Sequence, residues 1–209
     1  MQPYFQTTEF TTAASSLLII LNHFKPEISL SKEQEFKIWR ETVNLPTRGS
    51  SVYALAIYAK KQGLDLKVVV EEKEYGFPDY RFYRYTKEDI KQAEFCSNMY
   101  LKEAEKMNLM IEEREITLEN LKKELNDNNI LLLRINAKPI RNSKRNTSNY
   151  IAVTGYDGSK FQIIDPAFGA LSIPEEMMAE SFDSLESKKH RDHRMIIFKK
   201  NKNPFGTEL

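Results

Sequence analysis

Residues 6–17 read Gln-Thr-Thr-Glu-Phe-Thr-Thr-Ala-Ala-Ser-Ser-Leu, and they lead into the first helix that the sequence predicts. Thr11 or Thr12 can cap this helix, because a threonine hydroxyl accepts hydrogen bonds from first-turn amides. The helix runs to about Phe24, and Pro26 marks its end. One face of it is apolar, as packing on a core requires, and consists of Leu17, Leu18, Leu21 and Phe24.

The rest of the chain divides into a helical part and a strand-rich part. Further helices are expected over residues 31–41, 51–62, 87–109 and 117–125, with one early strand over 66–70. Strands dominate later, over residues 130–135, 150–156, 161–164 and 195–199, and Asp157-Gly158 predicts a hairpin turn between two of them. We therefore expect one α+β domain over residues 1–209. Its helical part (about 1–128) would pack on an antiparallel sheet part (about 129–200).

Composition limits the classes of protein and partner. The chain has 209 residues, enough for one domain with a substantial core, and 41% hydrophobic and 29% charged residues are typical of a soluble globular protein. The net charge of +1 gives no general attraction to nucleic acid or to an anionic membrane. A single cysteine, no signal-peptide pattern and no apolar run long enough to span a membrane favour a cytoplasmic location. No cofactor is expected, because seven glycines include no Gly-rich phosphate loop.

Three segments together carry a family resemblance that covers most of residues 5–170. The opening Gln6-Thr-Thr-Glu-Phe-Thr-Thr12 resembles the Gln-Thr-Thr-Glu-aromatic-Thr-Cys-Gly-Pro opening of the thirty-ninth family of cysteine peptidases. Residues 33–41, Glu-Gln-Glu-Phe-Lys-Ile-Trp-Arg-Glu, are similar to a stand-alone branch of that family. Residues 149–166, which begin Asn-Tyr-Ile-Ala-Val-Thr-Gly-Tyr-Asp and end Asp-Pro, resemble its His-aromatic-Val-Val-Val-Thr-Gly-Tyr-Asp … Asp-Pro hairpin.

The resemblance implies a papain-like fold and four equivalent positions. In the family a cysteine attacks, a histidine is the general base, an aspartate orients the histidine, and a glutamine stabilises the oxyanion. Carried over in that order, the positions are Thr12, Asn149, Asp165 and Gln6. The Gly-Pro that follows the family's nucleophile is also replaced here, by Ala13-Ala14.

Two of these four residues cannot perform the family's chemistry. A threonine hydroxyl is far less acidic than a thiol and attacks only when a strong base lies beside it. Asn149 cannot be that base, because a side-chain amide does not take up a proton at ordinary pH. We therefore expect a catalytically silent domain whose cleft binds a peptide or a small ligand. The candidate binding residues are Gln6, Thr12, Asn149 and Asp165, with Arg145 and Tyr80 beside them.

Other residues offer no clear replacement for the missing groups. His23 lies three helical turns beyond Thr12, about 16 Å along the axis, and fits a partly buried helix end. His190 and His193 fall in the charged run 188–194, which indicates a solvated segment without metal-ligand spacing. Cys96 shares a predicted helical face with apolar residues and is interpreted as a core cysteine.

Two alternatives remain open. The first is a hydrolase or transferase that uses Gln6, Thr12, Asn149 and Asp165 with a different mechanism. The second is a regulatory or structural subunit that contacts a partner protein away from the cleft, through residues 75–85, where aromatic and arginine side chains alternate.

Overall fold

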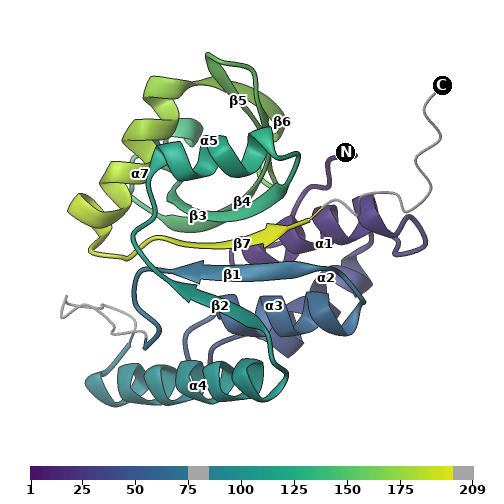
Figure 1. The fold of residues 1–209 in the computed structure, drawn as a ribbon. Coiled ribbons are helices and arrows are strands. Elements are labelled where there is room, and N and C mark those ends of the chain that lie inside the picture. Colours follow the sequence, from purple (N-terminus) through teal and green to yellow (C-terminus); the bar gives the residue numbers. More distant parts are fainter. Residues whose placement is uncertain (75–84, 200–209) are drawn as a thin grey trace.

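The computed structural model of the protein describes residues 1–74 and 85–199. Its strands form one seven-stranded sheet in the order β2-β1-β7-β3-β4-β5-β6 (Figure 1). β1 and β2 are parallel, and the other neighbouring pairs are antiparallel. The strands are β1 (Leu66–Val70), β2 (Met110–Glu113), β3 (Ile130–Asn136), β4 (Ser148–Tyr156), β5 (Lys160–Asp165), β6 (Gly169–Pro174) and β7 (Arg194–Phe198).

Helices cover both faces of this sheet. In Figure 1, α1 to α4 lie on one side, and α5 and α7 lie on the other side, within the curve of β3 to β6. The helices are α1 (Thr12–Phe24), α2 (Lys32–Thr42), α3 (Val52–Lys61), α4 (Lys87–Lys106), α5 (Leu118–Asn126), the short α6 (Lys138–Arg141) and α7 (Glu175–Lys189).

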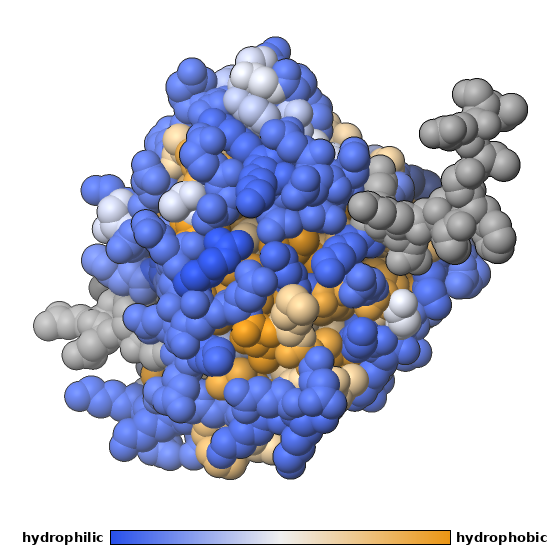
Figure 2. All heavy atoms as spheres, viewed as in Figure 1, coloured by the Kyte–Doolittle hydropathy of each residue, from blue (hydrophilic) through white to orange (hydrophobic). Residues whose placement is uncertain are grey.

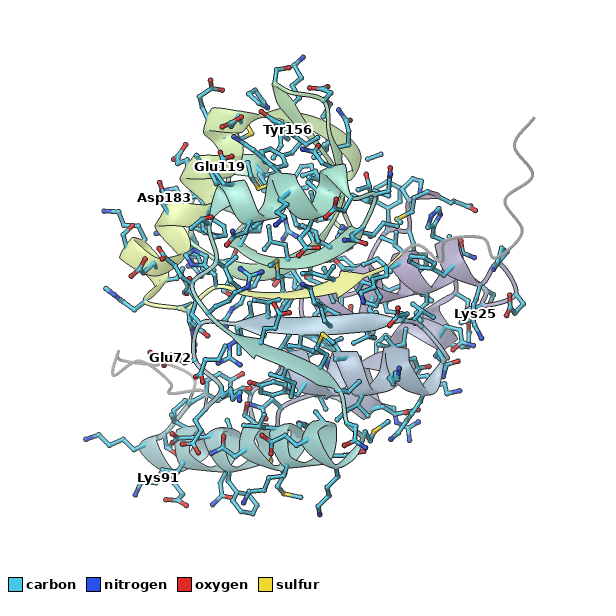
Figure 3. The ribbon with its side chains drawn as sticks, viewed as in Figure 1. Lys25, Glu72, Lys91, Glu119, Tyr156 and Asp183 are labelled. Carbon is cyan, nitrogen blue, oxygen red and sulfur yellow. The ribbon has the colours of Figure 1, made fainter. Side chains whose placement is uncertain are left out.

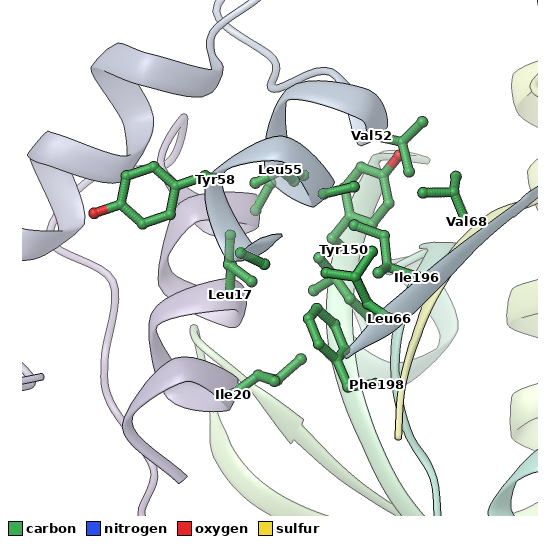
Figure 4. Packing of buried hydrophobic residues seen from close by; sticks show 14 of the residues in the cluster. Leu17, Ile20, Val52, Leu55, Tyr58, Leu66, Val68, Tyr150, Ile196 and Phe198 are labelled. Carbon is green, nitrogen blue, oxygen red and sulfur yellow. The ribbon is translucent and has the colours of Figure 1, made fainter. Parts of the chain in front are cut away.

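The central strand β3 shows why the sheet is covered twice. All of its residues are buried, so neither of its faces is exposed to solvent. Its alternate side chains enter two different hydrophobic cores: Ile130 and Leu132 pack with α1 and α3, whereas Leu131 and Leu133 pack with α5 and α7. Figure 4 shows the first core, in which Leu17 of α1 and Leu55 of α3 meet side chains of β1, β4 and β7.

The α+β papain-like class is confirmed, but the predicted division of the chain is too simple. The part up to residue 128 contains β2 besides the predicted strand β1, and the part after it contains α6 and α7. The parallel β1–β2 pair is possible because α4 supplies the long crossover that parallel neighbours need. β2 was not predicted, since Met-Ile-Glu-Glu at the sheet edge has exposed ends and only partly buried middle residues. β6 was not predicted either. The hairpin at Asp157-Gly158 is confirmed, and Gly158 there has a φ of 96°, which favours glycine.

The surface seen in Figure 2 is mainly hydrophilic, with hydrophobic residues gathered over the region where Figure 1 draws β1 and β2. Charged side chains such as those labelled Lys25, Lys91 and Asp183 in Figure 3 project from the outer elements. None of the helices in the described part of the chain is long and apolar enough to cross a membrane.

Candidate functional site

A cavity of about 400 Å³ opens where several elements begin or end. It lies at the end of the sheet where β3 stops and β4 and β7 start, and the first residues of α1 and α3 also line it. The loop between α2 and α3 completes one wall. Helix starts carry backbone amides that have no acceptor within the helix, so such a junction is chemically suited to hold a ligand.

Thr12 lies at this cavity as the first residue of α1. Its side chain is nearly buried, and its hydroxyl donates a hydrogen bond of 3.3 Å to the backbone oxygen of Glu9. α1 is held against β4 by Ser16, whose hydroxyl donates to the backbone oxygen of Tyr150 at 2.8 Å. Because Tyr150 follows Asn149, this contact brings Thr12 and Asn149 to the same cavity, which both residues line.

Asn149 and Asp165 are joined through a third residue, Arg141 at the end of α6. Nε of Arg141 donates to Oδ2 of Asp165 at 2.8 Å, and Nη2 donates to Oδ1 at 2.7 Å. The side-chain amide of Asn149 is assigned from its hydrogen bonds, with the oxygen accepting from Nη1 of Arg141 at 3.0 Å and the nitrogen donating to Ser148 O at 3.1 Å. Asp165 is completely buried and also accepts a bond of 2.9 Å from the Ala167 amide. The guanidinium of Arg141 thus binds both carboxylate oxygens of Asp165, the atoms that would otherwise orient a general base.

Gln6 lies beside the turn that follows Asp165. The backbone N–H of Gln6 donates to the backbone oxygen of Pro166 at 2.9 Å. Its side-chain oxygen Oε1 is buried, and within the described residues it has no hydrogen-bond partner. Neither Gln6 nor Asp165 belongs to the lining of the cavity, which therefore unites only Thr12 and Asn149 of the four predicted positions.

Glu35 on α2 fixes the segment that leads into α1. Its buried carboxylate accepts from the Thr7 amide at 3.0 and 3.2 Å, from the Tyr4 hydroxyl at 2.8 Å, from the Ser15 hydroxyl at 3.0 Å and from the Thr11 hydroxyl. All of these partners are donors, as an acceptor-only carboxylate requires. Burial and, after it, the bond to Glu35 raise the pKa of the Tyr4 phenol. In the sequence, only the family resemblance of residues 33–41 points to this role of Glu35.

The remaining candidates are spread over the structure. Arg145 is exposed and is not part of the cavity lining, and Tyr80 lies outside the described residues. The interpretation of residues 188–194 as solvated is wrong for His193, which is 4% exposed and stacks on Phe182 with 3.6 Å between ring centroids. Cys96 is half-buried rather than in the core, and His23 is exposed. Within residues 1–74 and 85–199, no three His, Cys, Asp or Glu side chains are grouped closely enough to hold a metal ion.

Sequence reasoning also missed the arginines of the cavity. Arg134 of β3 and Arg194 of β7 are buried in its lining, and both contact Asp192, Arg134 through Nη1 at 3.3 Å and Arg194 through Nε at 2.6 Å. One signal was available: Arg134 interrupts the apolar run 130–135, where a charge needs a specific partner. The convergence of Arg134 with Arg194 depends on the order of strands in the sheet, which the local sequence does not show.

Comparisons with known proteins place these observations in a family. The model of the Peptidase_C39 like family matches residues 1–202. One similar solved structure is a putative C39-like peptidase from Bacillus anthracis, with 12% identity, a TM-score of 0.51 and coverage of 96% of this chain and 95% of that one. At such low identity this likeness concerns the fold alone.

A second similar structure is a double glycine motif protease from an AMS/PCAT transporter in complex with the leader peptide. It has 17% identity and a TM-score of 0.47, and the match covers 96% of this chain and 99% of that one. No curated protein matches the chain in sequence. Because the family model spans nearly the whole sequence, the chain belongs to the Peptidase_C39 like family.

Proposed function

We propose that the protein is a catalytically silent member of its family that binds a peptide or a small ligand in the former active cleft. The observation that carries this proposal is the cavity itself. Thr12 and Asn149, which the resemblance equates with the nucleophile and the base, both line it, and Arg141 joins Asn149 to Asp165.

The geometry supports silence in two steps. First, the Thr12 hydroxyl donates its proton to a backbone oxygen, and an amide oxygen is too weak a base to activate it. Second, Asp165 binds a guanidinium with both of its oxygens, so it is already committed to a permanently charged partner. Neither Asn149 nor Asp165 is therefore left to take a proton from Thr12 and later return it to a leaving group.

The size of the cavity supports retained binding. A volume of about 400 Å³ lies within the range of small-molecule sites, and several polar side chains line it. The opening also has apolar contributors, including Phe10 and Val52, which a peptide side chain or an organic ligand can contact.

The test compares thiol chemistry and hydrolysis in matched variants. The unmodified protein should not hydrolyse fluorogenic peptides or esters. A Thr12→Cys variant in a Cys96→Ser background should react with iodoacetamide about tenfold faster at pH 7 than Cys96 of the unmodified protein, because the start of α1 and nearby arginines favour a thiolate. Adding Asn149→His supplies a base and should increase this rate further.

Two outcomes would overturn the proposal in different ways. Hydrolysis by the unmodified protein that Thr12→Ala abolishes would establish an enzyme with a new mechanism. A co-purifying protein that still binds after Thr12→Ala and Asn149→Ala would instead favour a partner subunit that acts through another surface.

A further inference from the structure

The loop between α2 and α3, which forms one wall of the cavity, is held in place by hydrogen bonds of its own. The backbone N–H of Asn44 donates to the backbone oxygen of Gly49 at 2.7 Å, and that of Ser51 donates to the backbone oxygen of Thr42 at 2.9 Å. The Thr47 hydroxyl donates to the backbone oxygen of Asn44 at 2.6 Å. The loop therefore presents its side chains to the cavity from a fixed backbone, which lowers the entropic cost of binding a ligand.

Two side chains of this loop differ from the rest in having no hydrogen-bond partner. The hydroxyls of Thr42 and Ser50 are bonded to each other at 3.0 Å, and that of Thr47 is bonded within the loop. In contrast, Oδ1 of Asn44 and Oγ of Ser51 are buried without a partner among the described residues. Asn44 is 5% exposed and Ser51 is 7% exposed, and both line the cavity.

Both groups remain available for a ligand. Ser51 precedes α3, but its side chain makes no capping bond, so the helix does not use its hydroxyl. A buried polar atom without a partner costs free energy, and this cost is removed when a bound molecule supplies the missing hydrogen bond. A ligand that reproduces the hydrogen bonds of the water it displaces gains affinity at such a place.

The chemistry of the two groups selects the kind of partner. A side-chain amide oxygen only accepts hydrogen bonds, so Oδ1 of Asn44 needs a donor, whereas the Ser51 hydroxyl can donate to a carbonyl oxygen. An ester or a carboxylate has no donor for Asn44, and an ammonium group has no acceptor for the Ser51 proton. An amide has both. Since half a turn of the Asn44 amide exchanges its oxygen with its nitrogen, a ligand with both functions can bond to it in either position.

We propose that the cavity binds an amide group of its ligand at Asn44 and Ser51. The ligand N–H donates to Oδ1 of Asn44, and the ligand carbonyl oxygen accepts from the Ser51 hydroxyl. Phe10 and Val52 line the same cavity and can contact the apolar atoms next to the amide. The inference rests on the proposed function, since it names the chemistry of the ligand in the same cleft. The amide is either a peptide bond or the carboxamide of a small molecule.

The binding test is a chemical-shift titration of the ¹⁵N-labelled full chain with matched probes. Benzamide should bind and shift the side-chain amide signals of Asn44. Acetophenone, in which a methyl group replaces the NH₂ of benzamide, should bind at least about tenfold more weakly, because it leaves the Asn44 acceptor unpaired. A capped alanine tripeptide with a C-terminal dimethylamide has peptide bonds but no carboxamide. Its affinity, measured beside that of benzamide, distinguishes a peptide source from a small-molecule source.

Matched variants assign the binding to the two side chains. Asn44→Leu should weaken the binding of the better amide probe about tenfold and Ser51→Ala about fivefold, because each removes one hydrogen-bond partner. Ser187→Ala, at an exposed serine of α7 outside the cavity, should change it less than twofold.

Stability supplies a second readout, which separates a ligand site from a structural role. The Ser51 hydroxyl has no partner among the described residues, so Ser51→Ala should not lower the midpoint of urea unfolding. If it does lower the midpoint, the hydroxyl serves the fold, and its assignment to a ligand is wrong.

The binding results decide the remaining points. If an amide probe binds and both Asn44→Leu and Ser51→Ala leave its affinity unchanged, the assigned site is wrong. If acetophenone binds in the cavity as tightly as benzamide, amide recognition is wrong, and the proposed function stands. If no probe shifts signals of the cavity residues, the amide inference fails, and the hydrolysis and thiol measurements still decide whether the cleft is silent. If Asn44→Leu does not fold, Ser51→Ala supplies the decision.

Discussion

Glu35 and Asp165 both have completely buried carboxylates, and their hydrogen-bond donors are of opposite kinds. Glu35 accepts hydrogen bonds only from uncharged donors, a backbone amide and hydroxyls, and these donors come from residues 4–15. Asp165 accepts mainly from the guanidinium of Arg141, which also reaches Asn149. The first arrangement fixes backbone, and the second fixes side chains at positions that the family resemblance equates with catalytic ones.

The largest loss of stability is expected when the guanidinium of Arg141, the charged partner of Asp165, is removed. Arg141→Met leaves Asp165 buried without its charged partner and should lower the free energy of unfolding by about 3–5 kcal/mol in urea titrations. Arg145→Met, an exposed arginine four residues along, should change it by less than about 0.5 kcal/mol. Adding Asp165→Asn to Arg141→Met should recover part of the loss. If the double variant is as unstable as Arg141→Met alone, Arg141 does not stabilise the protein by compensating the charge of Asp165.

A slightly smaller loss is expected from the first arrangement. Glu35→Ala leaves several buried donors without their acceptor and should cost about 2–4 kcal/mol, measured by the same titration. Glu41→Ala, an exposed acidic residue on the same helix, is the matched control and should be nearly neutral. Hydrogen exchange should also quicken at the Thr7 amide, whose bond to Glu35 is removed. If hydrogen exchange at the Thr7 amide is unchanged in Glu35→Ala, Glu35 does not hold the N-terminal segment in place.

A third acidic residue, Glu71, is paired with the titrating side chain of His193. The smallest change in stability is expected from this pair. Nδ1 of His193 lies 3.0 Å from Oε1 of Glu71, and the His193 amide donates to Oε2 at 2.7 Å. Burial lowers the pKa of His193, but the bonds to Glu71 and Phe182 outweigh burial and raise it above 6.5. Burial raises the pKa of Glu71, and the bonds to His193 outweigh burial and lower it below 4.5.

The signs of these two shifts fix the direction of the pH dependence. The His193 contribution is fully present below pH 6.5, the unfolded value, and is lost as pH rises through the higher folded pKa. The Glu71 contribution is present above pH 4.5 and is lost as pH falls through the lower folded pKa. Stability should therefore fall on both sides of the interval between these values, and His193→Gln should remove the fall on the alkaline side. If the stability of His193→Gln still falls at alkaline pH, another titrating group causes that fall.

The success of sequence reasoning differed between motifs and their surroundings. Thr12, Asn149 and Asp165 were chosen by the order and spacing of the family resemblance. α1 does begin at Thr12, but the predicted threonine cap is wrong, because the Thr11 side chain makes no capping bond and its hydroxyl donates to Glu35 instead. Arg141 was not among the candidate site residues, because nothing in the local sequence shows that α6 directs its side chain toward Asp165. Arg134 and Arg194 are 60 positions apart and meet only because β7 pairs with β3, a choice made by tertiary packing.

The position of β7 in the sheet has a consequence for how the molecule is made. Within residues 1–74 and 85–199, β7 is the last strand in sequence order, yet it pairs with β1 on one side and β3 on the other. During synthesis, β1 and β2 have no link to β3 through the sheet until residues 194–198 emerge. The two halves must therefore wait for a late, long-range closure, which is intrinsically slow. Arg194 enters the cavity with that same strand, so the lining of the cavity is complete only after β7 has joined the sheet.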